Sequence, residues 1–305
     1  MKLREFYDQG LEYGPDIIAR DKELSQAVQQ QLIRLGFLDP PADGKFGPLS
    51  LAALKEFQEA VNLKEDKGFL SHETAKELIE TKPEDLPEPE IILGKDIASR
   101  IVRYMKAKKY LVAARPGEMN IIYLEGVTPD TFELNSDTPN HFNDTRCLLT
   151  IIDKKPVIVD SWEATTEPGY RYTYHPMNPA GAARIAFGQY KAWRVGTHYG
   201  GGSEPHEALV QDAYIRVHRD FNQDMMRTGD NIQEGLFDIN QHYGFDLPRN
   251  DISFASAGCL VGRTRNGHRA FMSKLKQDRR YLLNPDFLFP TAIIDGEDLM
   301  NFKLS

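Results

Sequence analysis

Cysteine is scarce in this chain, since its 305 residues include only Cys147 and Cys259. One pair can close at most a single disulfide, which excludes the disulfide framework of a small secreted scaffold. Cys147 lies in the apolar run RCLLTII, and this setting predicts a residue of the core. Cys259 follows the small residues of SAGC and is the better candidate for chemistry.

Long apolar runs and basic clusters are also missing. No run approaches the roughly 18 apolar residues of a membrane-spanning helix, and MKLREFYDQG at the N-terminus lacks the apolar core of a secretory signal. The net charge is −8, and the short KAKK at 106–109 is the densest basic stretch. We therefore expect no membrane span and no nucleic-acid partner, and the sequence leaves the oligomeric state open.

Metal and nucleotide motifs are absent as well. The eight histidines include no HExxH pair, and no CxxC motif occurs. The stretch 220–224 resembles the start of a calcium loop, but Met225 stands where that loop needs glycine, which favours a surface turn. The glycines at 200–202 are not followed by the lysine of a phosphate loop. We expect neither a metal nor a cofactor.

The first eighty residues show helical periodicity. Apolar residues recur at helical spacing in 28–35 and again in 51–61. Gly36 can end the first helix in a left-handed conformation, and DGKFG at 43–47 is typical of a turn. The pattern predicts a small three-helix bundle, although periodicity alone does not distinguish it from other helical bundles.

These motifs also occur in a known order. LxxLGFL lies at 32–38, DGxFG at 43–47, AxxxFQ at 53–58 and TxxxL at 74–78. The order resembles that of the small peptidoglycan-binding module. The resemblance implies that residues 1–80 bind peptidoglycan, through its glycan or its stem peptides.

A segment rich in proline and acidic residues follows, and it favours an extended linker. We expect residues 81–109 to hold this linker and a helix, because apolar residues recur at helical spacing from Ile97 to Met105. The rest, 110–305, is expected to form a mainly β catalytic domain with peripheral helices, which makes the whole chain an α+β multidomain protein. The strand candidates are 120–127, 147–152, 156–164, 208–217 and 236–243, and a helix is expected near 267–277.

Two side chains of this domain suit nucleophilic chemistry. A cysteine attacks carbon as its thiolate, so Cys259 needs a nearby imidazole, and His242 lies seventeen positions before it. Alternation along 236–243 places His242 on one face with Asp238 and Asn240. Gly258 lets backbone N–H groups approach an oxyanion. The alternative is a buried thiol and an unrelated histidine at the end of a strand.

The spacing of these residues resembles the active-site signature of the YkuD-like L,D-transpeptidases. The residues that match it are His242, Tyr243, Gly244, Ser256, Gly258 and Cys259. The resemblance implies acyl transfer from a peptidoglycan stem peptide, with Cys259 as nucleophile, His242 as base and Ser256 orienting the imidazole or the substrate. Many members of this family have histidine at the position of Ala257 and arginine at that of Val261.

Further residues are expected to bind the substrate. Tyr243 and Gly244 belong to the signature itself, and Arg263 is a stand-in for the missing arginine. Tyr174 lies in a region that resembles the substrate-facing side of the YkuD-like fold. His198 is the second candidate histidine, although its place beside the glycines at 200–202 also suits a solvated loop residue.

Three functions remain open. Cysteine-dependent transpeptidation or peptidase cleavage follows from the resemblance. A phage-type or secreted wall hydrolase uses the same residues and is favoured by the missing signal sequence, and a non-catalytic wall-binding protein is suggested by the missing arginine. Each acts at the cell wall, in the periplasm or outside the cell. Because the sequence shows no recognisable signal peptide, cytoplasmic synthesis followed by release through a non-standard route is one way to reach that site.

Overall fold

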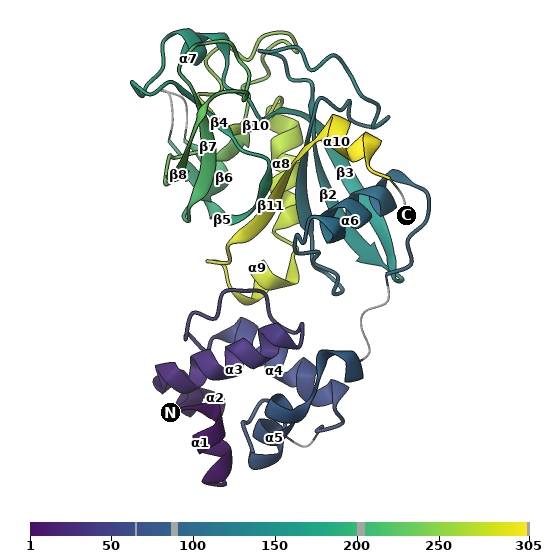
Figure 1. The fold of residues 1–305 in the computed structure, drawn as a ribbon, viewed down its shortest axis with the longest axis vertical. Coiled ribbons are helices and arrows are strands. Elements are labelled where there is room, and N and C mark those ends of the chain that lie inside the picture. The colour runs from purple at the N-terminus through teal and green to yellow at the C-terminus, as the bar shows by residue number, and fades with distance from the viewer. Residues whose placement is uncertain (65, 87–90, 200–204, 304–305) are drawn as a thin grey trace. The chain divides into compact units, whose positions relative to one another are not determined.

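The computed structural model describes residues 1–64, 66–86, 91–199 and 205–303. The chain divides into two compact units, Met1–Glu90 and Ile91–Ser305. The first unit is helical and the second is rich in strands, as Figure 1 shows, so the predicted α+β organisation with N-terminal helices is confirmed. Across the described ranges, no helix has both the length and the apolar character that crossing a membrane requires.

The first unit contains more helices than the three predicted ones. Those three are α3, α4 and α5. Two short helices, LREFYD and PDIIAR, precede them, and each begins directly after a residue with extended backbone, Lys2 and Gly14. Leu24, Leu32 and Phe57 are completely buried in the core of the unit. The bounds are α1 (Leu3–Asp8), α2 (Pro15–Arg20), α3 (Lys22–Arg34), α4 (Pro48–Ala60) and α5 (His72–Glu80), followed by a short 3-10 helix, η1 (Pro83–Asp85).

A buried glutamine links the turn at 43–47 to helix α3. The side-chain oxygen of Gln29, on α3, accepts the N–H of Gly44 at 2.7 Å, and its amide nitrogen donates to Asp43 at 2.8 Å. Gly36 ends α3 at a φ of 79°, a left-handed conformation that glycine adopts without strain. The turn and the helix end are therefore fixed by local contacts.

The second unit is built on a closed barrel of eight strands in the order β1-β11-β5-β6-β9-β10-β3-β2, with a separate sheet β4-β7-β8. The strands are β1 (Asn120–Glu125), β2 (Asp144–Ile152), β3 (Lys155–Thr165), β4 (Ala182–Ile185), β5 (Gly188–His198), β6 (His206–Gln211), β7 (Ile215–Asp220), β8 (Asn231–Gly235), β9 (Gln241–Tyr243), β10 (Leu260–Gly262) and β11 (Phe289–Asp295). The helices are α6 (Ile97–Ala107), α7 (Tyr170–Tyr174), α8 (Arg265–Leu275), α9 (Arg279–Leu283) and α10 (Gly296–Asn301).

Helix α6 is part of the second unit, although the sequence placed it in the segment 81–109 between the domains. Its residues Ile101 and Met105 are completely buried in one core with Ile122 of β1 and Cys147 of β2. Apolar burial of this extent holds the helix on the barrel. The same core confirms the prediction that Cys147 is a core residue.

Two predicted strands differ from the observed ones. The candidate 208–217 is two strands, because β6 belongs to the barrel and β7 to the other sheet, so the chain turns between them. The candidate 236–243 shrinks to β9. The side-chain oxygen of Gln211 accepts the N–H groups of Phe237 and Ile239, each at 3.0 Å, and Asp238 takes a φ of 56°. A strand cannot continue through that conformation, so Asp238 does not share the face of His242.

Candidate active site

Cys259 directly precedes β10, which lies between β9 and β3 in the barrel. Strands β9 and β10 run parallel, with Val261 opposite His242. The loop before Cys259 packs against β10 through an apolar cluster that contains Phe142, Ile252 and Val261. The topology therefore brings Cys259 and His242 onto neighbouring strands, as the signature requires.

The SAGC turn is held by its serine. The hydroxyl of Ser256 donates to the carbonyl of Cys259 at 2.9 Å and accepts the N–H of Gly258 at 3.1 Å. Gly258 has a φ of 129°, and a Cβ there would lie 2.5 Å from the carbonyl oxygen of Ala183. Ser256 thus shapes the turn, and these contacts direct it to the backbone instead of the imidazole.

The same contact narrows the choice among the backbone N–H groups near Gly258 that are expected to bind an oxyanion. The N–H of Gly258 is already bound to Ser256. Among the described residues, the N–H groups of Ala257 and Cys259 have no hydrogen-bond partner. Those two groups, which flank the N–H of Gly258, are the better candidates to bind a developing oxyanion.

The sulfur of Cys259 lies against backbone and is a protonated thiol at neutral pH. Its Sγ is 3.6 Å from the carbonyl oxygen of Asp238. Burial raises the pKa of Cys259 to about 11, although the backbone N–H of Asn240 donates to it and acts in the opposite direction. Burial therefore opposes formation of the predicted thiolate, because desolvation disfavours the charged form.

His242 is buried and neutral. Its Nδ1 lies 2.8 Å from the carbonyl oxygen of Tyr243, and because a carbonyl only accepts, Nδ1 carries the proton and Nε2 has the free lone pair. Burial lowers the pKa of His242 well below its usual value, and a positive charge on the neighbouring His198 acts in the same direction. No hydrogen bond within the described chain joins this ring to the sulfur of Cys259. The pair is a neutral imidazole and a neutral thiol.

His198 is not a solvated loop residue. It is the last residue of β5, is only 8% exposed, and stacks on His242 with ring centroids 4.0 Å apart. Burial, followed by the effect of His206, lowers the pKa of His198 to about 4. The glycines at 200–202 lie outside the described residues.

Two of the expected substrate-binding residues are structural. Tyr243 is buried, with its ring stacked on that of His206 at 3.6 Å. A Cβ on Gly244 would lie 2.8 Å from the ring of Phe142. Both residues therefore pack the interior instead of facing a substrate.

The remaining two are placed differently. Arg263 forms an ion pair with Glu163 and donates to the carbonyl of Leu247 at 3.2 Å, so its guanidinium is already engaged. Tyr174 ends α7 and is 49% exposed, with its ring 5.8 Å from that of Tyr170. Helix α7 starts beside the SAGC turn, since Gly169 donates to the carbonyl of Ser256 at 2.9 Å. Tyr174 is the accessible member of the expected set.

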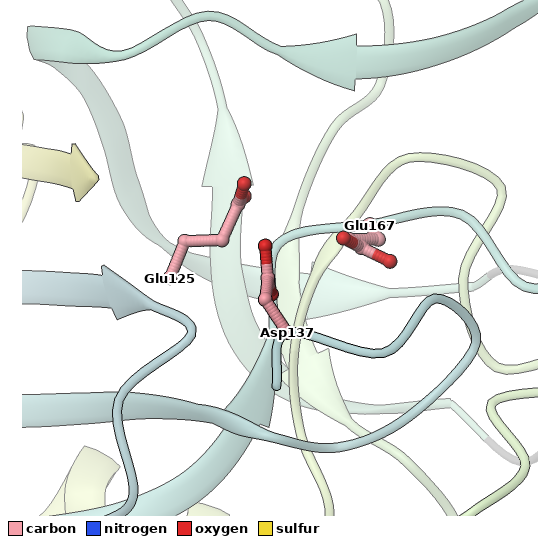
Figure 2. Close-up of side chains that lie close together, drawn as sticks. All are labelled: Glu125, Asp137 and Glu167. Atoms are coloured by element: carbon pink, nitrogen blue, oxygen red, sulfur yellow. The ribbon is translucent and has the colours of Figure 1, made fainter. Parts of the chain in front are cut away.

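Sequence reasoning missed a cluster of carboxylates. Figure 2 shows Glu125, Asp137 and Glu167 close together, and one oxygen of each lies within 4.8 Å of the others. Asp144 belongs to the same network through the hydroxyl of Thr166 at 3.0 Å. These residues come from separate parts of the chain, and no spacing signal in the sequence connects them.

Arginines neutralise part of this cluster. Arg227 forms an ion pair with Glu125, and Arg184 forms one with Glu167 and another with Glu125 at 3.5 Å. Burial acts to raise the pKa of Glu125, but Arg227, Arg184 and the hydroxyl of Thr166 together outweigh it and bring the pKa to about 2. Burial and the neighbouring Glu125 raise the pKa of Asp144. The guanidinium groups supply the positive charge that a metal would bring, so we interpret the cluster as a structural ion network.

The raised pKa of Cys259, a partly buried residue, leads to a test by alkylation. In a Cys147→Ser background, the rate of iodoacetamide labelling of Cys259 should rise with pH and keep rising above about 9.5, where an ordinary cysteine with a pKa of about 8.5 levels off. The reason is that the pKa of the thiol is raised to about 11 by burial. His242→Ala should open the site and increase labelling at pH 8. A rate that levels off below pH 8 in the unmodified site would show a thiolate instead.

Comparisons with known proteins agree with the two-part organisation. Residues 22–78 match the family described as "Putative peptidoglycan binding domain". A comparison with curated proteins found no significant match. The chain thus combines an N-terminal peptidoglycan-binding domain with a β-rich second domain.

Two solved structures are similar to the chain. One is a fused Zn-dependent amidase/peptidase/peptidoglycan-binding domain-containing protein from Clostridium acetobutylicum ATCC 824, with 14% identity, a TM-score of 0.29, and coverage of 88% of this chain and 94% of that one. The other is an L,D-transpeptidase from Xylanimonas cellulosilytica DSM 15894, with 16% identity, a TM-score of 0.25, and coverage of 88% and 92%.

Proposed function

We propose that this protein transfers acyl groups of peptidoglycan stem peptides through a thioester on Cys259. The observation that carries the proposal is a glycine-dependent SAGC turn that presents Cys259 on the strand beside His242, in a chain with a peptidoglycan-binding domain at 22–78. The turn is specific because a Cβ on Gly258 would collide with backbone. The domain directs the chain to the wall, and the turn supplies the nucleophile.

The neutral pair acts by general-base catalysis. His242 Nε2 takes the thiol proton as the sulfur attacks the amide carbon, so an S–C bond forms and the carbonyl π electrons move onto oxygen. The N–H groups of Ala257 and Cys259 donate to that oxygen. When the C–N bond breaks, the departing amine takes the proton from His242, and a thioester remains. Catalytic hydrogen bonds that are long or absent in a free enzyme commonly tighten when substrate binds.

The fate of the thioester defines two forms of this activity. Attack by an amine gives a cross-link or an exchanged residue, and attack by water gives cleavage, as in a wall hydrolase. Both reactions use the same residues, and exclusion of water decides between them. Tyr174, exposed at the end of the helix that starts beside the turn, is a candidate to contact the substrate.

A second candidate is a wall-binding protein without turnover. The observation that favours it is the raised pKa of the Cys259 thiol, which follows from burial. The pairing of Arg263 with Glu163 adds to it, because no guanidinium is then left at this position for a substrate carboxylate. In that case the second domain serves as a scaffold, and the first one carries the function.

Purified muropeptides separate these candidates. The full-length protein is incubated with them, and the products are followed by mass spectrometry. An increase in mass by one stem peptide or one residue shows transpeptidation, and loss of a residue or stem shows hydrolysis. Retained binding to the wall with no change in mass over a long incubation refutes the acyl-transfer proposal in favour of the second candidate.

The first unit should bind the wall by itself. Residues 1–90 form one compact unit with its own buried core, so we expect the fragment to fold and to sediment with purified peptidoglycan sacculi. Residues 91–305 should remain in the supernatant and keep any turnover of soluble muropeptides. A folded 1–90 fragment, verified by circular dichroism, that stays in the supernatant would contradict this assignment.

A further inference from the structure

Three histidine rings from three strands meet on the barrel, and one of them belongs to β9, which pairs with the strand that follows Cys259. His198 of β5 and His242 of β9 stack face to face, with centroids 4.0 Å apart and planes 8° from parallel. His206 of β6 meets both of them edge-on, at 5.3 and 5.8 Å. The face-to-face contact of His198 is therefore with the ring that serves as the proposed base.

Asn240 fixes the protonation of His198. The side-chain oxygen of Asn240 accepts the N–H of Gln211 at 2.9 Å, so its NH2 group lies on the other side of the amide. That NH2 group lies 3.1 Å from Nδ1 of His198. A nitrogen that accepts this hydrogen bond carries no proton, which leaves His198 neutral with its proton on Nε2.

The two stacked rings are therefore opposite tautomers. His242 carries its proton on Nδ1, because that atom faces the carbonyl of Tyr243 at 2.8 Å. His198 carries its proton on Nε2, because its Nδ1 accepts from Asn240. Each tautomer is set by a neighbour that can act in only one way, a main-chain carbonyl in one case and an amide already fixed by Gln211 in the other.

We propose that His198 is a positioning residue for His242: Asn240 holds it neutral, and its ring face fixes the His242 imidazole and faces the positive charge that forms when His242 takes the proton of Cys259. This inference rests on the proposed function. A cation is attracted to the face of a neutral aromatic ring, whereas a protonated His198 would repel the imidazolium. Sequence gives no sign of it, since the stack joins β5 to β9 only in the folded barrel.

Nitrogen-detected NMR of the full-length protein tests the arrangement independently of activity. Long-range ¹H–¹⁵N spectra should show the proton of His198 on Nε2 and that of His242 on Nδ1. In the Asn240→Asp variant the new carboxylate can accept from both Gln211 and His198, so the proton of His198 should appear on Nδ1. A wild-type His198 with its proton on Nδ1 overturns the proposal.

Muropeptide kinetics test the role of the ring face. His198→Ala should lower kcat by about 10- to 100-fold with KM nearly unchanged, a loss typical of removing a group that orients a reacting residue. His198→Phe keeps a neutral aromatic face and should restore most of kcat. His218→Ala is the control, because among the described residues His218 of β7 makes no ring contact with these histidines.

The outcomes separate this inference from the proposed function. If wild-type protein turns over no muropeptide, the proposed function fails, and the NMR spectra alone decide about His198. His198→Ala should then make His242 exchange between tautomers or shift its ring signals, and the His218→Ala variant should not. A His198→Ala protein that is folded and keeps both the wild-type His242 signals and any wild-type kcat refutes the positioning role.

Discussion

Replacing Cys259 with serine is expected to lower turnover of muropeptides by on the order of 10⁴-fold or more, the scale of losing a catalytic nucleophile. The alkoxide is much harder to generate than the thiolate, and His242 is a weak base because burial lowers its pKa. The first-order rate of product formation by mass spectrometry measures the effect. Binding to sacculi should be unchanged, because residues 22–78 are untouched.

Cys147→Ser is the matched control. Cys147 is completely buried in an apolar core, so a hydroxyl there should cost about 1–3 kcal/mol of the free energy of unfolding and leave kcat of the folded protein intact. Urea denaturation measures the cost. If Cys147→Ser abolishes turnover while Cys259→Ser retains it, the assignment of the nucleophile is wrong.

Replacing Arg184 with methionine should lower the free energy of unfolding by about 3–5 kcal/mol at pH 7, because the buried carboxylate of Glu125 then loses one of its two arginine partners. Arg184 is only 5% exposed and contacts both Glu125 and Glu167. Arg227 then remains as the guanidinium that pairs with the cluster. Urea denaturation of variant and wild type gives the difference directly.

The pH dependence of that loss identifies its cause. Burial raises the pKa of Glu167 to about 8 even with Arg184 present, and without Arg184 this pKa rises further, so through Glu167 the variant is penalised relative to wild type only as pH rises above about 8. The difference from wild type should therefore be larger at about pH 9 than at pH 7. His198 destabilises both proteins equally as pH falls from 6.5 toward 4, since burial lowers its pKa to about 4.

A second substitution checks the same explanation. At about pH 9, Glu167→Gln in the Arg184→Met background removes the unpaired charge and should recover the part of the lost free energy that appears above pH 8. A loss that is equal at pH 7 and pH 9, or whose increase above pH 8 is unchanged by Glu167→Gln, would instead indicate that packing of the arginine stem is responsible.

The helical module could be predicted from sequence because its contacts are local. Gln29 binds a turn fifteen residues later, and Gly36 ends the helix in which Gln29 lies. Spacing and turn chemistry record such contacts directly. The two helices before α3 were missed because each has only six residues, too few to show a period.

The candidate site could be predicted only in part. The placement of Cys259 and His242 at neighbouring strands could be predicted because a loop of fixed length joins those strands. The stack of His198 on His242 depends on the strand order of the barrel, which pairing of distant segments decides. The shortened β9 depends on the side chain of Gln211, which competes with a sheet ladder for backbone N–H groups. Neither effect leaves a periodic signal.

The barrel is closed by strands that are far apart in the chain. Strand β1 pairs with β11 in parallel, with Ile121 opposite Thr291. On a ribosome that adds about 5–20 residues per second, β1 therefore waits at least several seconds for its partner. During that time its apolar edge is open, and contacts of such long separation slow folding. Synthesis of this protein should accordingly depend more on chaperones acting on the second unit than on the first, whose helices can form as they emerge.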